Sequence, residues 1–163
     1  MTMTTLIRPL ALAALFVAVS AFAASELGAD ERYNAVTDPL TLKECGACHM
    51  AFQPQMLPAK SWHLVMDGLS DHFGEDASLP EEPAAKIRAY LTANAADASW
   101  WGGRFMRGLD ETKGPLRITE TPHWIREHSH EVPASAWADP KVKSKANCVA
   151  CHPRAQQGMY DDD

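Results

Sequence analysis

The sequence predicts a small, mostly α-helical protein built as a single domain. No segment sustains the alternation of apolar and polar residues that marks a β-strand. Several segments instead carry apolar residues at helical spacing behind residues that cap helices. All four cysteines of the 163-residue chain also fall in two Cys-x-x-Cys-His motifs, one toward each end. Together these features predict short helices packed around two bound groups.

A helix is expected before each motif. Asp38 followed by Pro39 is typical of an N-cap with proline at the first helical position. This helix would run into residues 45–49. Asp139 and Pro140 repeat the pattern before the second motif, which predicts a second helix of the same kind.

Further helices are expected between the motifs. Residues 58–73 form an amphipathic pattern, with Gly74 at its C-terminal end and apolar positions at Trp62, Val65, Met66 and Leu69. Ser78 and Glu81 have the spacing of a capping box and precede a helix through Ile87, Tyr90 and Leu91. Thr121 and Pro122 begin another helix, over residues 123–131.

The cysteines and the histidines that follow them form two identical motifs: Cys45, Cys48 and His49, and Cys148, Cys151 and His152. A Cys-x-x-Cys-His motif predicts covalent attachment of a c-type haem. Both thiols bond to the macrocycle, and the adjacent histidine becomes an axial ligand of the iron. Because no cysteine is left over, the sequence predicts two covalently bound haem c groups.

Two other interpretations of the cysteines stay open. A Cys-x-x-Cys pair also occurs in redox dithiols, and two such pairs can build a structural zinc site. A redox dithiol should follow a strand in a βαβ unit, and no alternating apolar run precedes either pair. A four-cysteine zinc site would not require a histidine after each pair.

The first 23 residues have the pattern of a secretory signal peptide. A single basic residue, Arg8, precedes an apolar run over residues 10–22, and Ala21-Phe22-Ala23 resembles a cleavage site. We therefore expect residues 1–23 to be removed and residues 24–163 to form the haem domain in the periplasm. The alternative is an uncleaved membrane anchor.

The chain is acidic, with a formal net charge of −6. Removal of residues 1–23, whose only charged side chain is Arg8, would make this about −7. This charge disfavours a nucleic-acid partner and is compatible with a basic protein partner or simply with solubility. Acidic clusters occur at residues 75–76, 81–82 and 161–163.

Each iron needs a second axial ligand, and five histidines remain: His63, His72, His123, His128 and His130. Methionine is the other usual ligand. On a helix over residues 58–73, His72 lies at the edge of the apolar face, whereas His63 lies on the polar side. We therefore expect His72 to be an axial ligand.

The same argument applies to the helix over residues 123–131. His128 shares a face with Trp124, whereas His123 and His130 point away. His128 is therefore the second expected ligand. His72 follows His49 by 23 residues and His128 precedes His152 by 24, so each half of the chain can ligate its own haem, although ligation between halves stays open.

At this point the chain resembles the small bacterial dihaem cytochromes c. The resemblance covers nearly all of the chain after residue 23 and rests on six segments: residues 45–50, 57–62, 71–78, 117–122, 126–128 and 146–152. It implies two histidine ligands at both haems and a periplasmic electron carrier. It also implies a small oxygen-binding monohaem cytochrome c as electron acceptor and a membrane b-type cytochrome as a further partner.

The residues themselves also favour electron transfer over catalysis. No serine nucleophile constellation, phosphate loop or paired-carboxylate motif stands out, so neither an enzyme nor a small-molecule substrate is expected. The alternative is a peroxidase-like haem enzyme or a gas sensor, and either would need one open iron. A structural domain held by zinc or disulfides is a third alternative.

Overall fold

The computed structural model describes residues 32–98, 103–110 and 112–160. The expected signal peptide, Trp100 and Trp101, and the acidic cluster at 161–163 lie outside these residues. Within them the protein is helical, as predicted, and its only β-type pairings are two isolated bridges. None of the helices in this part of the chain has the length and apolar content needed to cross a bilayer.

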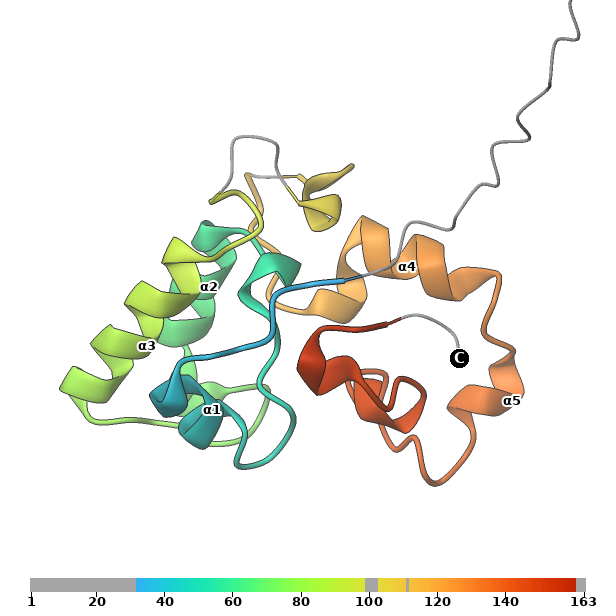
Figure 1. The fold of residues 1–163 in the computed structure, drawn as a ribbon, viewed down its shortest axis with the longest axis horizontal. Helices are drawn as coiled ribbons and strands as arrows, with labels where there is room; N and C mark the ends of the chain where they lie inside the picture. The colour runs from blue at the N-terminus through green and yellow to red at the C-terminus, as the bar shows by residue number, and fades with distance from the viewer. Residues whose placement is uncertain (1–31, 99–102, 111, 161–163) are drawn as a thin grey trace, which may run out of the picture.

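The helices are short and are joined by loops and 3-10 turns. The elements are, in chain order, α1 (Pro39–Cys45), η1 (Pro54–Met56), α2 (Ala59–Asp67), η2 (Leu69–Asp71), α3 (Glu81–Ala93), η3 (Arg104–Met106), η4 (Ile118–Glu120), α4 (Pro122–Ser129), α5 (Ala134–Trp137), η5 (Cys148–Ala150) and η6 (Ala155–Gln157). Helices α1, α2 and α3 form one side of the molecule, and α4, α5 and the C-terminal turns form the other (Figure 1).

The first side is built on the packing of α2 against α3. Trp62 and Met66 on α2 and Ile87 and Leu91 on α3 are buried in one apolar cluster. The Trp62 indole N–H donates to the carbonyl of Pro54 at 2.8 Å, so its polar edge is satisfied inside the core. Burial of four large side chains, each contributing about 1.5–3 kcal/mol, makes this cluster the main apolar contribution on this side.

Helix α1 begins as the sequence predicts. The Asp38 carboxylate accepts hydrogen bonds from the Thr41 backbone N–H at 2.7 Å and from its hydroxyl at 2.8 Å, and Pro39 occupies the first turn. These bonds lower the pKa of Asp38. The helix ends at Cys45, and the remainder of the first motif follows in turns. The cap therefore fixes where the first cysteine emerges.

The matching helix before the second motif does not form, and here the prediction was wrong. The Asp139 carboxylate accepts from the Lys141 backbone N–H at 2.8 Å, but Lys143 has a φ of +60°, which interrupts a right-handed helix. Only the 3-10 turn η5 carries Cys148. The segment offers a single apolar residue, Val142, to the core, so no apolar face drives helix formation.

The expected helix over residues 58–73 is shorter than predicted. Helix α2 ends at Asp67, with Gly68 donating to the carbonyls of Leu64 and Val65. The 3-10 turn η2 follows, and the chain then turns sharply at Phe73 and Gly74, which have φ values of +58° and +100°. The capping box at Ser78 also does not form, because Pro80 is the N-cap of α3.

A second apolar cluster and the Gln53 side chain are among the contacts that join the two sides. Phe105 and Met56 are buried in a second apolar cluster, against which Trp124 and Tyr160 also pack. The fully buried Gln53 side chain donates to the Ala155 carbonyl at 2.7 Å and accepts from the Tyr160 hydroxyl at 2.6 Å. Because both Gln53 bonds span more than 100 residues, this side chain fixes the segment after the first motif against the segment after the second.

Candidate haem-binding sites

The first site brings together two imidazoles. The ring centres of His49 and His72 are 6.2 Å apart, with an angle of 27° between the ring planes. The Nδ1–H of His49 donates to the Met50 carbonyl at 2.7 Å, so Nε2 carries the free lone pair. A backbone partner of this kind fixes both the tautomer and the ring orientation of a metal-binding histidine. Phe52 stacks on His49 at 4.9 Å.

A tight turn, and not a helix, positions His72. The His72 N–H donates to the Glu75 carbonyl at 2.7 Å, and the Glu75 N–H donates back at 3.3 Å. Phe73, in the left-handed conformation that bulky residues rarely adopt, places its ring 4.8 Å from the His72 ring. The Arg117 guanidinium lies 3.9 Å from the centre of the Phe73 ring, a cation–π contact that stabilises this strained turn.

The His72 imidazole is kept neutral. Burial, assisted by the nearby His49 and by the Arg117 cation, holds the pKa of His72 below its ordinary value. A neutral imidazole has a lone pair to offer, and this is the form that binds a metal.

The two imidazoles of the second site are as far apart as those of the first site. The ring centres of His128 and His152 are also 6.2 Å apart, although their planes are nearly perpendicular at 82°. The Nδ1–H of His128 donates to the Trp124 carbonyl one turn earlier on α4, at 2.9 Å, which again leaves Nε2 free. Trp124 stacks on His128 with ring centres 4.2 Å apart, and the Trp137 ring lies 6.1 Å from His128.

His152 is positioned by a contact from the C-terminal segment. The Tyr160 ring meets the His152 ring edge-on at 5.4 Å, and the Tyr160 hydroxyl is held by Gln53. The second site is therefore connected through Gln53 to the segment that follows His49. Sequence reasoning missed both Gln53 and Tyr160, because neither residue belongs to a motif and their contact exists only in the folded chain.

The spacing of each histidine pair fits a haem. An imidazole nitrogen binds a first-row metal ion at about 2 Å, and the ring centre lies about 1.2 Å behind that nitrogen. Two imidazoles on opposite sides of one iron therefore have ring centres roughly 6.4 Å apart. Both observed separations agree with this value, and each pair lies beside its own cysteine motif.

The thiols differ from those of a redox dithiol or a zinc site. Burial, and to a smaller extent the charges of Glu44 and Asp38, raises the pKa of Cys45, and burial raises the pKa of Cys148 to about 11. Redox dithiols instead need a lowered thiol pKa. All four cysteines are free thiols, and in the described part of the chain no three His, Cys, Asp or Glu side chains meet as a metal site. The two pairs therefore do not join around a zinc ion.

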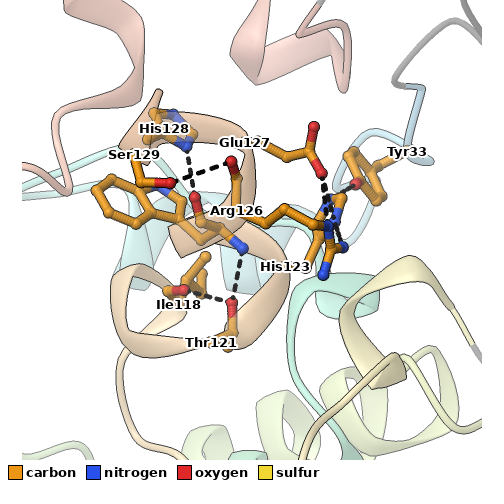
Figure 2. Close-up of polar contacts among 9 residues, drawn as sticks. Tyr33, Ile118, Thr121, His123, Arg126, Glu127, His128 and Ser129 are labelled. Carbon is orange, nitrogen blue, oxygen red and sulfur yellow. Dashed lines mark hydrogen bonds and ion pairs between the residues drawn. The ribbon is translucent and has the colours of Figure 1, made fainter. Parts of the chain in front are cut away.

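His123 is a buried structural residue on the side of α4 opposite His128 (Figure 2). Arg126 can only donate, so the Arg126 bond to Nδ1 at 3.0 Å places the ring proton on Nε2, which faces the Tyr33 hydroxyl at 3.3 Å. Burial lowers the pKa of His123, outweighing the raising effect of Glu127. The sequence predicts that His123 points away from the packed face. The residue is instead buried, with an exposed fraction of 4 %, so this prediction was wrong.

We expect His123→Ala to lower the free energy of unfolding by about 1–3 kcal/mol, because a buried ring and its hydrogen bonds are lost. The visible spectrum should not change, since both ring nitrogens are used by the protein. Denaturant titration of the haem-loaded protein measures the first effect, and absorption measures the second. The exposed His130→Ala serves as the control and should change neither. A loss of low-spin absorption in His123→Ala would contradict this assignment.

Two sites, each with a cysteine pair and two facing imidazoles, define a c-type cytochrome with two haems. A family model for dihaem cytochrome c matches residues 41–160. The chain belongs to the dihaem cytochrome c family, and its cysteine pairs fit the haem c attachment motifs. It is therefore a haem electron-transfer protein.

Solved structures agree with this assignment. The chain is 50% identical to the diheme cytochrome c from Rhodobacter sphaeroides, with a TM-score of 0.74, over 78% of this chain and 99% of that chain. It is 45% identical to DHC purified from Rhodobacter sphaeroides, with a TM-score of 0.64 over 77% and 98% of the two chains. It is 34% identical to a diheme cytochrome type c from Shewanella baltica, with a TM-score of 0.62 over 76% and 86%. No curated protein matches the chain.

Proposed function

We propose that this protein is a periplasmic electron carrier in which each haem is bound by two histidines. His49 and His72 would hold one haem, and His128 and His152 the other. The observation that carries the proposal is the equal spacing of 6.2 Å in both pairs. Ligation within each half of the chain follows from the same pairing.

The roles of the residues follow from this ligation. When bound, each haem iron takes up and releases one electron. With two histidines as ligands of each iron, neither iron would have a coordination position open to a substrate. The backbone bonds to Nδ1 of His49 and His128 keep the imidazoles in place during redox change. Aromatic rings pack on two of the imidazoles, Phe52 on His49 and Trp124 on His128, and limit how far these rings can move.

The proposed partners come from the resemblance in sequence. A small oxygen-binding monohaem cytochrome c is the proposed acceptor, and a membrane b-type cytochrome is a further candidate partner. The secretory pattern of residues 1–23 supports a periplasmic location. Cleavage after Ala23 is tested by the N-terminal sequence of protein purified from a periplasmic fraction.

The test of the carrier function is the resting spin state of the iron. In protein matured in a host that assembles c-type haem, we expect absorption and paramagnetic-resonance spectra with two low-spin ferric haems. The second signal should differ in shape from the first, because the ring planes meet at 27° in one pair and 82° in the other. A substantial high-spin component would contradict the proposal and favour a peroxidase-like enzyme or a gas sensor.

A further inference from the structure

The charged side chains are distributed unevenly along the chain. Residues 61–85, which carry His72, contain six acidic side chains and no lysine or arginine. Residues 140–160, which carry the second motif, contain no acidic side chain and four basic ones, Lys141, Lys143, Lys145 and Arg154. Although the whole chain is acidic, residues 140–160 therefore carry only basic charges. Asp161–Asp163 lie outside the described residues.

Three exposed lysines lie within five residues of one another on one loop, and we call this segment the lysine face (Lys141, Lys143 and Lys145). All three are exposed, and none makes an ion pair with a described residue. They lie on the loop that connects α5 to the C-terminal turns (Figure 1). Lys141 and Lys143 also have no cation–π contact with a described residue, so neither charge has a partner that would explain it by folding, and a role in recognition is favoured.

The lysine face is attached to the second haem site. The Asn147 side chain donates to the carbonyls of Val142 at 3.0 Å and Lys141 at 3.4 Å, which folds the loop back onto the residue before Cys148. Lys145 Nζ lies 5.8 Å and 5.7 Å from the ring centres of Trp124 and Trp137, the two indoles beside His128. A partner on this face would thus stand next to the residues that hold the second haem.

An apolar side chain lies within the same segment. Val149, between the two attachment cysteines, is 39 % exposed. An apolar centre with a charged rim is the usual composition of a transient protein interface. Three lysines are few for nucleic acid or a lipid surface, where affinity depends on many phosphate contacts. The favoured occupant is therefore an acidic protein.

We infer that the lysine face docks an acidic redox protein, which exchanges electrons with the second haem; this inference rests on the proposed function as an electron carrier. The overall charge of −6 does not prevent such docking. At physiological ionic strength charges are screened beyond about 8 Å, so a partner at contact is governed by the lysines beneath it. One electron passes from the reduced partner to a ferric haem, with no bond made or broken.

The experiment uses the haem-loaded protein and an acidic flavodoxin, in its fully reduced form, as the probe. Stopped-flow mixing gives the second-order rate of haem reduction across a salt series. We compare Lys141→Glu/Lys143→Glu/Lys145→Glu with Lys43→Glu/Lys86→Glu/Lys113→Glu, which changes the net charge equally but acts on exposed lysines elsewhere. A neutral quinol reports whether each variant still accepts electrons.

We expect the lysine-face variant to lose about tenfold or more of its rate at low ionic strength and the control variant to change by roughly twofold at most. The rate of the unmodified protein should fall with salt. Equal losses in both variants, or none in either, would overturn the inference. Failure to accept electrons from the quinol in the unmodified protein would instead contradict the proposed function. If the triple variant fails to assemble, Lys141→Gln/Lys143→Gln, which removes two positive charges without adding negative ones, must still slow the flavodoxin reaction.

Discussion

Replacing His72 or His128 by methionine is expected to raise the reduction potential of one haem by roughly 0.1–0.2 V, within the ~0.8 V range that axial ligands span. A thioether is a weaker donor than imidazole and favours ferrous iron. Each single variant should shift one haem and leave the other near its original value, because each histidine faces only one motif histidine, at 6.2 Å. Redox titration followed by visible absorption resolves the two haems.

The matched controls for this experiment are His63→Met and His130→Met. Both histidines are exposed, and neither has a ring contact with a motif histidine among the described residues. Their substitution should leave both potentials in place. A shift in His63→Met with none in His72→Met would show that the ligand has been assigned to the wrong residue.

Removal of one cysteine pair should remove one haem. In Cys148→Ala/Cys151→Ala we expect the mass of the denatured protein to show a single attached haem, and in Cys45→Ala/Cys48→Ala the same. The two variants should retain different haems, and their low-spin signals should sum to that of the unmodified protein. Retention of two covalent haems in either variant would contradict attachment through these motifs.

Loss of the second haem should loosen the C-terminal side of the molecule. This effect should be larger than the effect of losing the first haem on the side formed by α1, α2 and α3. The C-terminal side contains only the short helices α4 and α5 and 3-10 turns, and its exposed Ile125 and partly buried Trp124 lie on α4 next to His128. The first side keeps the α2 and α3 core, whose buried side chains pack on one another in a single apolar cluster. Limited proteolysis of the two variants distinguishes these outcomes.

Local features of the structure could be read from the sequence because their causes are local. The Asp38 cap of α1 and the Thr121 cap of α4 formed where the residue pattern predicted them, since a cap needs only a side-chain oxygen and an amide three residues later. The repeat of that pattern at Asp139 failed. Its following segment has no apolar face to pack, and packing supplies most of the stability of a short helix.

His72 illustrates the limit of reasoning from periodicity. Helical periodicity predicts this residue as a ligand because it lies on one face of an expected helix, yet in the structure it lies in a turn beyond the end of α2. Its position opposite His49 is set by the bonds with Glu75 and by the contact of Phe73 with Arg117, which lies 44 residues later in the chain. The selected residue faces His49, but for a different physical reason.

The sequence by itself determined the chemistry: two motifs that take two haems, the residue types available as ligands, and a mostly helical chain. The tertiary structure alone decided which histidines face each other, that His123 is a core residue, and that Gln53 joins the two sites through Ala155 and Tyr160. The physical reason is the separation along the chain of the residues that interact. Motifs and caps act within a few residues, whereas these contacts join side chains up to 107 residues apart, whose proximity depends on how the whole chain packs.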